Sequence, residues 1–137
     1  MTTLSQAALD VLNTCDPREK ALKTRRYAIQ WRAGQIIDIA REELPDRPSR
    51  PNKPELCSPT EMPKRAKAGS LKSKIALLHA LAHIELNAID LAWDVMARQF
   101  DLGGYKLPKN FYNDWCKVAD DEAKHFLMLE ERLNDLG

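Results

Sequence analysis

Apolar residues recur at intervals of three and four positions along most of this chain, which is the spacing of one face of an α-helix. Together with the capping and breaking residues that flank it, the pattern predicts four helices, over residues 4–12, 17–34, 70–100 and 108–137. Nothing between the two long helices has the composition of a strand. The sequence therefore predicts an all-α fold.

The two N-terminal helices carry recognisable end signals. Ser5 could cap the first of them. Asp16 is a suitable cap for the second, Pro17 favours its first helical position, and Gly34 stands near its end. Residues 36–40, which include three isoleucines, either extend this helix or form another short one.

A proline-rich arm separates these helices from the long ones. Six of the chain's eight prolines lie between residues 45 and 63, a density that forbids both a long helix and a central strand. We expect residues 45–69 to form either an extended, polyproline-like arm packed along the helices or a plain linker. Residues 58–61, Ser-Pro-Thr-Glu, match a capping box, which predicts one helical turn within the arm.

The two long helices are predicted to form an antiparallel hairpin over residues 70–137. Ser70 is a good cap for the first, Gly103 and Gly104 end it, and Pro108 begins the second. A chain of 137 residues that is 44% hydrophobic can build one modest core. We therefore expect residues 1–137 to form a single domain, with N-terminal helices (1–44), arm and hairpin.

Charge and cysteine content narrow the classes of function. Twenty-one basic and 20 acidic residues leave a formal charge of +1, which gives no overall attraction to nucleic acid or to an anionic membrane. The basic segment 64–74 has no neighbouring aromatic residue, so a solvated loop is favoured over a phosphate-binding patch. Cys15, Cys57 and Cys116 form no CxxC pair, and the N-terminus has neither a secretory signal nor a membrane span. We expect a soluble protein of the reducing cytoplasm.

Two glutamates and a histidine interrupt the apolar faces of the long helices. An α-helix turns by about 100° per residue, so residue numbers give side-chain directions. Glu85 and Glu122 each lie within about 40° of an apolar stripe, and His125 lies about 60° from Glu122. These three side chains are therefore predicted to face the core. The stripe around Glu85 comprises Leu78, Leu81, Ile89, Ala92 and Met96, and that around Glu122 comprises Phe111, Trp115, Val118, Phe126, Leu129 and Leu133.

Three neighbours of Glu122 are interpreted differently. Asp120 and Lys124 point to the far side of the helix and are expected to be solvated charges. Asp121 stands four residues before His125, where its carboxylate would accept a hydrogen bond from the imidazole and fix its tautomer.

A second polar group lies on the opposite face of the first long helix, which is either exposed or packed against the N-terminal helices; it comprises His79, His83, Asp90 and Asp94. The spacing of His79 and His83 suits zinc, but Ala80 stands where a metalloprotease helix has glutamate. A structural role is favoured for this histidine pair.

The inward glutamates require a partner, because burying an ionised carboxylate alone costs several kcal/mol, comparable with the stability of a small domain. Basic residues are absent from both stripes except at helix ends, where Lys74 is the nearest candidate. A lone Glu on one helix and Glu-x-x-His on its neighbour form half of the ligand set of di-iron carboxylate bundles. Glu85, Glu122 and His125 are thus candidate metal ligands. The alternative is a protonated or hydrogen-bonded glutamate pair with a satisfied histidine.

Three segments together resemble the N-terminal half of a ferritin-like family of bacterial proteins classed as a domain of unknown function: RPSRPNKPELCSPTEMPKR, ALLHALAHIELNAIDLAWD and FYNDWCKVADDEAKHF. The resemblance implies a ferritin-like helical bundle with a di-metal centre. Only Glu85, Glu122 and His125 match the ligand pattern. Family members are about twice as long and carry a second helix pair with another Glu-x-x-His, which is missing here. This chain is either a fragment or a naturally short version, and the resemblance then implies that its metal site is incomplete within one chain.

These observations lead to two functional hypotheses. The first is a di-iron carboxylate oxidoreductase or hydroxylase, with manganese as an alternative metal, an unspecified small-molecule substrate, and a homodimer that completes the site. The resemblance also points to a modified transfer RNA base as substrate, although no residue singles it out. The second hypothesis is a metal-storing or metal-free helical interaction module. Nucleophilic catalysis by Cys116 is disfavoured, because the residue lies about 120° from Glu122 and no base is positioned for it.

Overall fold

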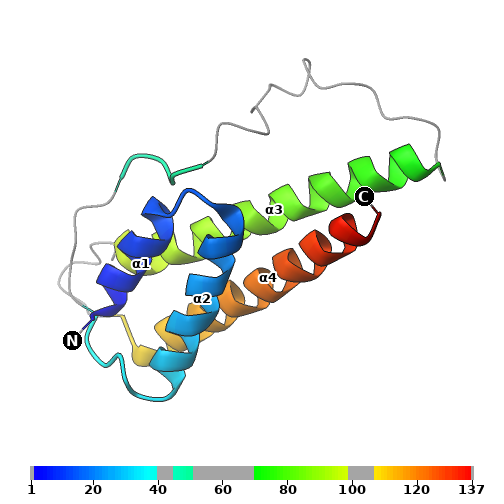
Figure 1. The fold of residues 1–137 in the computed structure, drawn as a ribbon. Coiled ribbons are helices and arrows are strands. Elements are labelled where there is room, and N and C mark those ends of the chain that lie inside the picture. The colour runs from blue at the N-terminus through cyan, green and yellow to red at the C-terminus, as the bar shows by residue number, and fades with distance from the viewer. Residues whose placement is uncertain (1, 40–44, 51–69, 99–106, 137) are drawn as a thin grey trace.

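The computed structural model describes residues 2–39, 45–50, 70–98 and 107–136 (Figure 1). These residues contain helices and no strand, which confirms the all-α class. Two helices are short and two are long: α1 (Leu4–Asn13), α2 (Pro17–Arg32), α3 (Leu71–Arg98) and α4 (Lys109–Leu136). The predicted turn at residues 58–61 and the glycine pair at 103–104 lie outside the described residues.

The long helices α3 and α4 run antiparallel, side by side, and α1 and α2 pack across one side of this hairpin (Figure 1). The short helices cover the end where α3 finishes and α4 begins, while the other end of the hairpin projects beyond them. At the covered end α1 packs on α3, and α2 packs mainly on α4. One side of the hairpin therefore holds most of the core.

The core is built around the second half of α3. Trp93 is completely buried, and its indole N–H donates a hydrogen bond to the Thr24 hydroxyl of α2 at 3.0 Å. Ile89 and Met96 lie on the same side of α3 and are also enclosed. The surrounding helices contribute mainly small or aliphatic side chains, which allows close packing.

The predicted N-cap residues were right for α2 and α3 and wrong for α1. Asp16 caps α2 by accepting a hydrogen bond from the Glu19 N–H at 2.9 Å, and Ser70 caps α3 by accepting one from Ser73 at 3.1 Å. The N-cap of α1 is Thr3, which forms a capping box with Gln6. Ser5 lies inside the helix and is buried, because α1 begins one residue before it, at Leu4.

The prediction that residues 36–40 are helical is wrong for the described part, residues 36–39. Gly34 adopts a left-handed conformation with a φ of 76°, which does not allow the helix of α2 to continue. The following segment turns back to α1, where the carbonyls of Asp38 and Ile39 accept hydrogen bonds from Leu4 and Ser5 at 2.8 and 3.0 Å. These bonds satisfy N–H groups in the first turn of α1 that have no partner within the helix.

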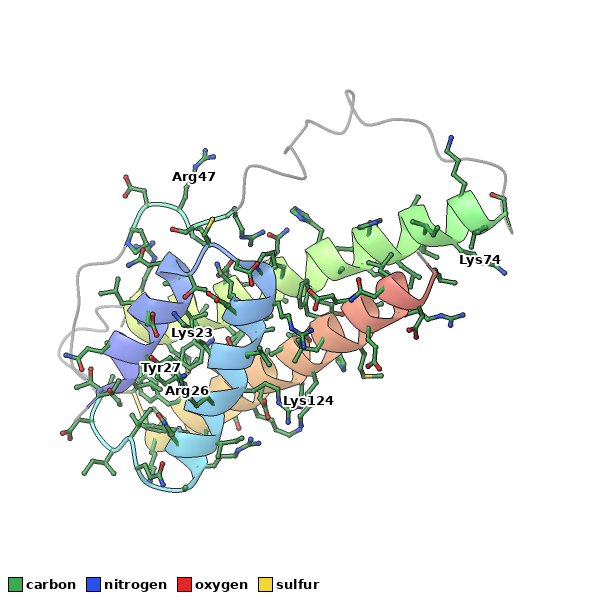
Figure 2. The ribbon with its side chains drawn as sticks, in the orientation of Figure 1. Lys23, Arg26, Tyr27, Arg47, Lys74 and Lys124 are labelled. Atoms are coloured by element: carbon green, nitrogen blue, oxygen red, sulfur yellow. The ribbon has the colours of Figure 1, made fainter. Side chains whose placement is uncertain are left out.

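Two aspartates are buried in ion pairs between elements. Asp120, predicted to be solvated, is fully buried between α2 and α4, where its carboxylate lies 2.9 Å from Arg32 and 3.3 Å from Arg25. Lys124 also approaches it, at 3.5 Å (Figure 2). The prediction failed because α2 covers the side of α4 that was expected to face solvent.

Asp90 forms the second buried pair. Its carboxylate accepts a hydrogen bond at 2.7 Å from Lys20, whose side chain has no exposed surface, and it is also paired with Arg50. Burial lowers the pKa of Lys20, while the hydrogen bond to Asp90 acts in the opposite direction. The described start of the arm is thereby held against the helices, since Lys20 also donates to the Ser49 carbonyl at 3.1 Å. This agrees with an arm packed along the helices, as far as residue 50.

Helix α3 is long and apolar enough to cross a membrane by length and composition alone. Its packing offers another reason for this composition, because α3 contacts each of the other described helices. It also carries Asp90, whose charge is paired with Lys20 in the protein interior.

Candidate metal centre

Three side chains from the hairpin converge at its middle. Glu85 comes from α3, and Glu122 and His125 come from α4, where a spacing of three residues places them on one face. One possible ligand atom from each residue lies within 4.8 Å of the others. The Nδ1 atom of His125 lies 3.7 Å from a carboxylate oxygen of Glu85 and 3.7 Å from one of Glu122. The structure therefore brings together the three residues singled out from the sequence.

The local sequence explains how the two helices bring these groups into range. Ala82 stands nearly one turn before Glu85, and Ala119 and Ala123 flank Glu122 in the chain. All three alanines are buried. Small side chains at such positions let two helices approach closely, because interaxial distance depends on the residues at the contact.

The three side chains differ in exposure. The Glu85 and Glu122 side chains are 21% and 25% exposed, whereas that of His125 is 53% exposed. Both glutamates thus point into the hairpin as predicted, but His125 lies at its edge and not in the core. The reason is that α1 and α2 pack on the other side of the hairpin and leave this edge uncovered.

One carboxylate oxygen of the cluster is buried without a hydrogen bond. The Oε2 atom of Glu85 is buried and accepts no hydrogen bond in the described structure. A buried acceptor without a hydrogen bond costs about 1–3 kcal/mol, and more when it is charged. The nearest ionic neighbour of this atom is the Nδ1 of His125, which at 3.7 Å is too far away to donate a hydrogen bond to it.

No described Lys or Arg forms an ion pair with either glutamate of this cluster; their ionic neighbour is His125. Lys74, the nearest basic residue considered from the sequence, lies toward the outer end of α3 (Figure 2). The cluster consequently has two acidic groups and one imidazole, with no protein cation of fixed charge. This donor set is one that a divalent metal ion would fit.

Asp121 does not hold His125 as expected. Its carboxylate instead lies 3.7 Å from Lys117, one turn earlier on α4, and its side chain is well exposed. The histidines of α3 also lie outside the cluster. His79 is exposed, and burial lowers the pKa of the partly buried His83, with a further contribution from the nearby Arg50. Neither belongs to the group of potential ligands found among the described residues.

Cys116 is unsuited to nucleophilic chemistry. Its side chain is buried, with Sγ 3.6 Å from the Met96 sulfur. Burial raises the pKa of the Cys116 thiol to about 12, so the thiolate is scarce at neutral pH. Cys15, in contrast, is exposed and free.

The described residues define an all-helical protein with a carboxylate–histidine cluster in the middle of a helical hairpin. A family model described as "Protein of unknown function (DUF455)" matches residues 13–137, and the chain belongs to this family.

An uncharacterised protein of Haemophilus influenzae is 41% identical over 149 residues, an alignment that covers all of this chain and 50% of the relative. The chain thus spans about half the length of the curated relative that it matches. No solved structure matches it.

Proposed function

We propose that Glu85, Glu122 and His125 bind a divalent transition metal, with iron or manganese as the ion. Carboxylate oxygens suit manganese, imidazole nitrogen suits iron, and mixed oxygen and nitrogen donors are typical of non-haem iron sites. The three donors lie within 4.8 Å of one another, so modest side-chain movement would place them around one ion. Both glutamates would also lose their mutual repulsion on binding a cation.

The unpartnered Oε2 of Glu85 is the observation that carries this proposal. The atom is buried, and the Nδ1 of His125 is 3.7 Å away from it. A buried acceptor that lacks a hydrogen bond lowers the stability of the metal-free protein. A metal ion bound to Glu85 would supply the missing positive charge and so offset that cost.

The proposed class is a ferritin-like carboxylate protein with a two-metal site, acting as an oxidoreductase or a hydroxylase on a small molecule. In the di-iron bundles of this class, two lone glutamates and two Glu-x-x-His motifs hold the metals. This chain supplies one of each, as Glu85 and the pair Glu122 and His125. Bound iron would supply redox chemistry with dioxygen or peroxide, while these side chains hold and orient it.

Metal analysis of the purified chain tests the proposal. Protein prepared without chelator, or reconstituted with ferrous or manganous ion, should retain metal in elemental mass spectrometry. Glu122→Ala should abolish retention, because it removes a ligand from the middle of the cluster. Asp121→Asn is the matched control, since it removes the adjacent carboxylate, which pairs with Lys117. Absence of metal after reconstitution, or equal loss in both variants, would refute the proposal.

One observation favours the second hypothesis, a metal-free helical interaction module. The Nδ1 of His125 lies 3.7 Å from both carboxylates, so a protonated imidazole could compensate their charge without a metal. In that case His125→Ala would destabilise the metal-free protein, and added metal would not change its unfolding temperature. Under the metal proposal, added metal raises that temperature in the wild-type protein.

A further inference from the structure

The hairpin has one side that no described element covers. On α3 this side carries Leu77, Leu81, Ile84 and Leu91, and on α4 it carries Val118 and Met128, all of them exposed. We call these six residues the open face. Ile84, Leu91 and Met128 are 59%, 59% and 67% exposed, which is unusual for side chains of this size on neighbouring helices.

Helical geometry shows that the six residues form one surface. Around α3 they lie about 40–120° from Glu85 in one rotational sense, and around α4 they lie about 40–120° from Glu122 in the same sense. Because the helices run antiparallel, equal rotations in the same sense point to the same side of the hairpin. The residues of α3 and α4 that α1 and α2 bury are rotated from Glu85 and Glu122 in the opposite sense. Glu85 and Glu122 therefore stand on the boundary between a covered and an uncovered side.

The outer end of the hairpin is also incompletely packed. In α3 no residue from Leu71 to Leu81 is buried, and in α4 none from Leu127 to Leu136 is buried. The outer half of α3 and the end of α4 thus carry apolar side chains that no described element encloses, which indicates that a further element covers them.

The cluster lies at the centre of this surface. Glu85 stands 14 residues from the start of α3 and 13 from its end, and Glu122 stands 13 residues from the start of α4 and 14 from its end. His125 lies about 60° from Glu122 in the sense of the open face, and its side chain is half exposed there. A twofold axis through the middle of the open face would consequently pair both helices over their whole length and bring two clusters together.

We propose that the open face binds a second copy of this chain about such an axis, so that two hairpins form one four-helix bundle and two clusters share one two-metal site. This inference rests on the proposed metal binding. The arrangement supplies the two lone glutamates and two Glu-x-x-His motifs that such a site needs, of which one chain holds half. Because the two copies are related by symmetry, each contributes the same three ligands, and no further protein ligand is needed.

The size of the surface agrees with a stable pair. Each long helix has 28 residues, which corresponds to a length of about 42 Å, and two packed helices are about 20 Å wide. The hairpin side thus offers an area on the order of 800 Å², which is what each partner contributes to a standard protein interface. Its exposed apolar residues are aliphatic, as at the centre of an obligate interface, and the charged side chains of Asp114, Asp121 and Arg132 of α4 lie in the same range of directions.

Light scattering coupled to gel filtration tests the pairing with the full chain. The wild-type protein at micromolar concentration should have the mass of two chains. Ile84→Glu should give a folded monomer, because it places a charge in the open face. Ile29→Glu is the matched control: Ile29 is 53% exposed on α2, away from the open face, and its variant should remain a dimer. Circular dichroism verifies that both variants are helical.

Metal content measured on the same samples separates this inference from the proposed function. One metal per chain in a dimer, with weaker retention in Ile84→Glu, supports both. A wild-type monomer that retains metal overturns the pairing and leaves metal binding intact. A dimer without metal overturns metal binding, and with it the shared site. A dimer that persists in the Ile84→Glu variant overturns the proposed interface. A wild-type monomer that sediments with phosphatidylcholine vesicles, when the Ile84→Glu variant does not, also overturns it.

Discussion

Three acidic residues of the long helices are buried or partly buried, and their negative charges are balanced in different ways. Asp90 is held by Lys20 and Arg50, and Asp120 by three basic side chains around it. Glu85 has no basic partner of fixed charge among the described residues. Its Oε2 and the Asp120 Oδ1 are both buried without a hydrogen bond, but the Asp120 Oδ1 lies 3.3 Å from Arg25. The first two aspartates join one element to another through basic side chains, whereas the ionic neighbour of Glu85 among the described residues is His125, 3.7 Å away. The contrast separates residues that hold the fold from a residue available to a ligand.

Removing the charge of Asp90 should be strongly destabilising. Asp90→Asn leaves the Lys20 ammonium buried without its counter-charge, and breaking a buried pair in this way costs about 3–5 kcal/mol. Asp94→Asn is the matched control one turn later, because the Asp94 carboxylate pairs with Arg98 near the surface and its loss should cost about 0.5 kcal/mol or less. Urea unfolding at pH 7 measures both values.

A double variant shows whether the cost comes from the unpaired charge. Lys20→Met with Asp90→Leu removes both charges and restores apolar volume, so it should recover much of the stability lost in Asp90→Asn. Equal losses in Asp90→Asn and Asp94→Asn would contradict the assigned difference between the two aspartates.

At the scale of elements, the end of α2 determines how α1 begins. Gly34 takes a left-handed conformation, and the chain then returns so that the carbonyls of residues 38 and 39 accept bonds from the first turn of α1. Ile36, in the same segment, is buried against the core. A short irregular connection thereby replaces the helix that its isoleucines suggested.

Gly34→Ala should test this connection without disturbing packing. No atom lies within 4 Å of the position that a Cβ would occupy, so the cost is conformational alone. A left-handed conformation costs an L-residue about 1–2 kcal/mol, which corresponds to a fall of roughly 3–6 °C in unfolding temperature. Gly34→Asn should lose less, because asparagine tolerates this conformation better. An unchanged unfolding temperature in Gly34→Ala would show that the turn relaxes freely.

The sequence predicted the helices well and the direction of their faces less well. Caps such as Asp16 and Ser70 are local signals, and a side chain next to the helix start determines them. Burial depends on where other elements pack. Centring the apolar side on Glu122 placed Asp120 in solvent and Val118 in the core, and the structure reverses both. The buried side is rotated by roughly 80° because α1 and α2 cover only one side of the hairpin.

The candidate site was nonetheless predictable in part. Glu85, Glu122 and His125 stand near the boundary of the buried side, so the rotation moved His125 to the edge and left the glutamates between the helices. The spacing of Glu122 and His125 is local, and an antiparallel hairpin of equal helices brings Glu85 opposite them. Asp121 could not be placed, since Lys117 and His125 are both within one turn of it and only the structure distinguishes them.

At the scale of the whole molecule, Glu85 should lower the stability of the metal-free protein and raise that of the metal-bound protein. Without metal, Glu85→Gln removes a negative charge beside Glu122 and supplies an amide that can donate to it. The metal-free variant should therefore be more stable than the wild type, by about 1 kcal/mol or roughly 3 °C in unfolding temperature. With manganous ion at 100 times its dissociation constant, the wild type should gain about 2.7 kcal/mol, while the variant gains little.

The order of unfolding temperatures should thus reverse between chelator and metal. Thermal unfolding followed by circular dichroism, with and without manganous ion, measures this reversal, and Asp121→Asn should behave as the wild type in both conditions because its carboxylate lies outside the cluster. A Glu85→Gln variant that is less stable without metal would show that the glutamate contributes to the fold itself. Equal gains from metal in both proteins would place the ion elsewhere. The reversed order is expected only if Glu85 destabilises the metal-free protein and binds the added metal.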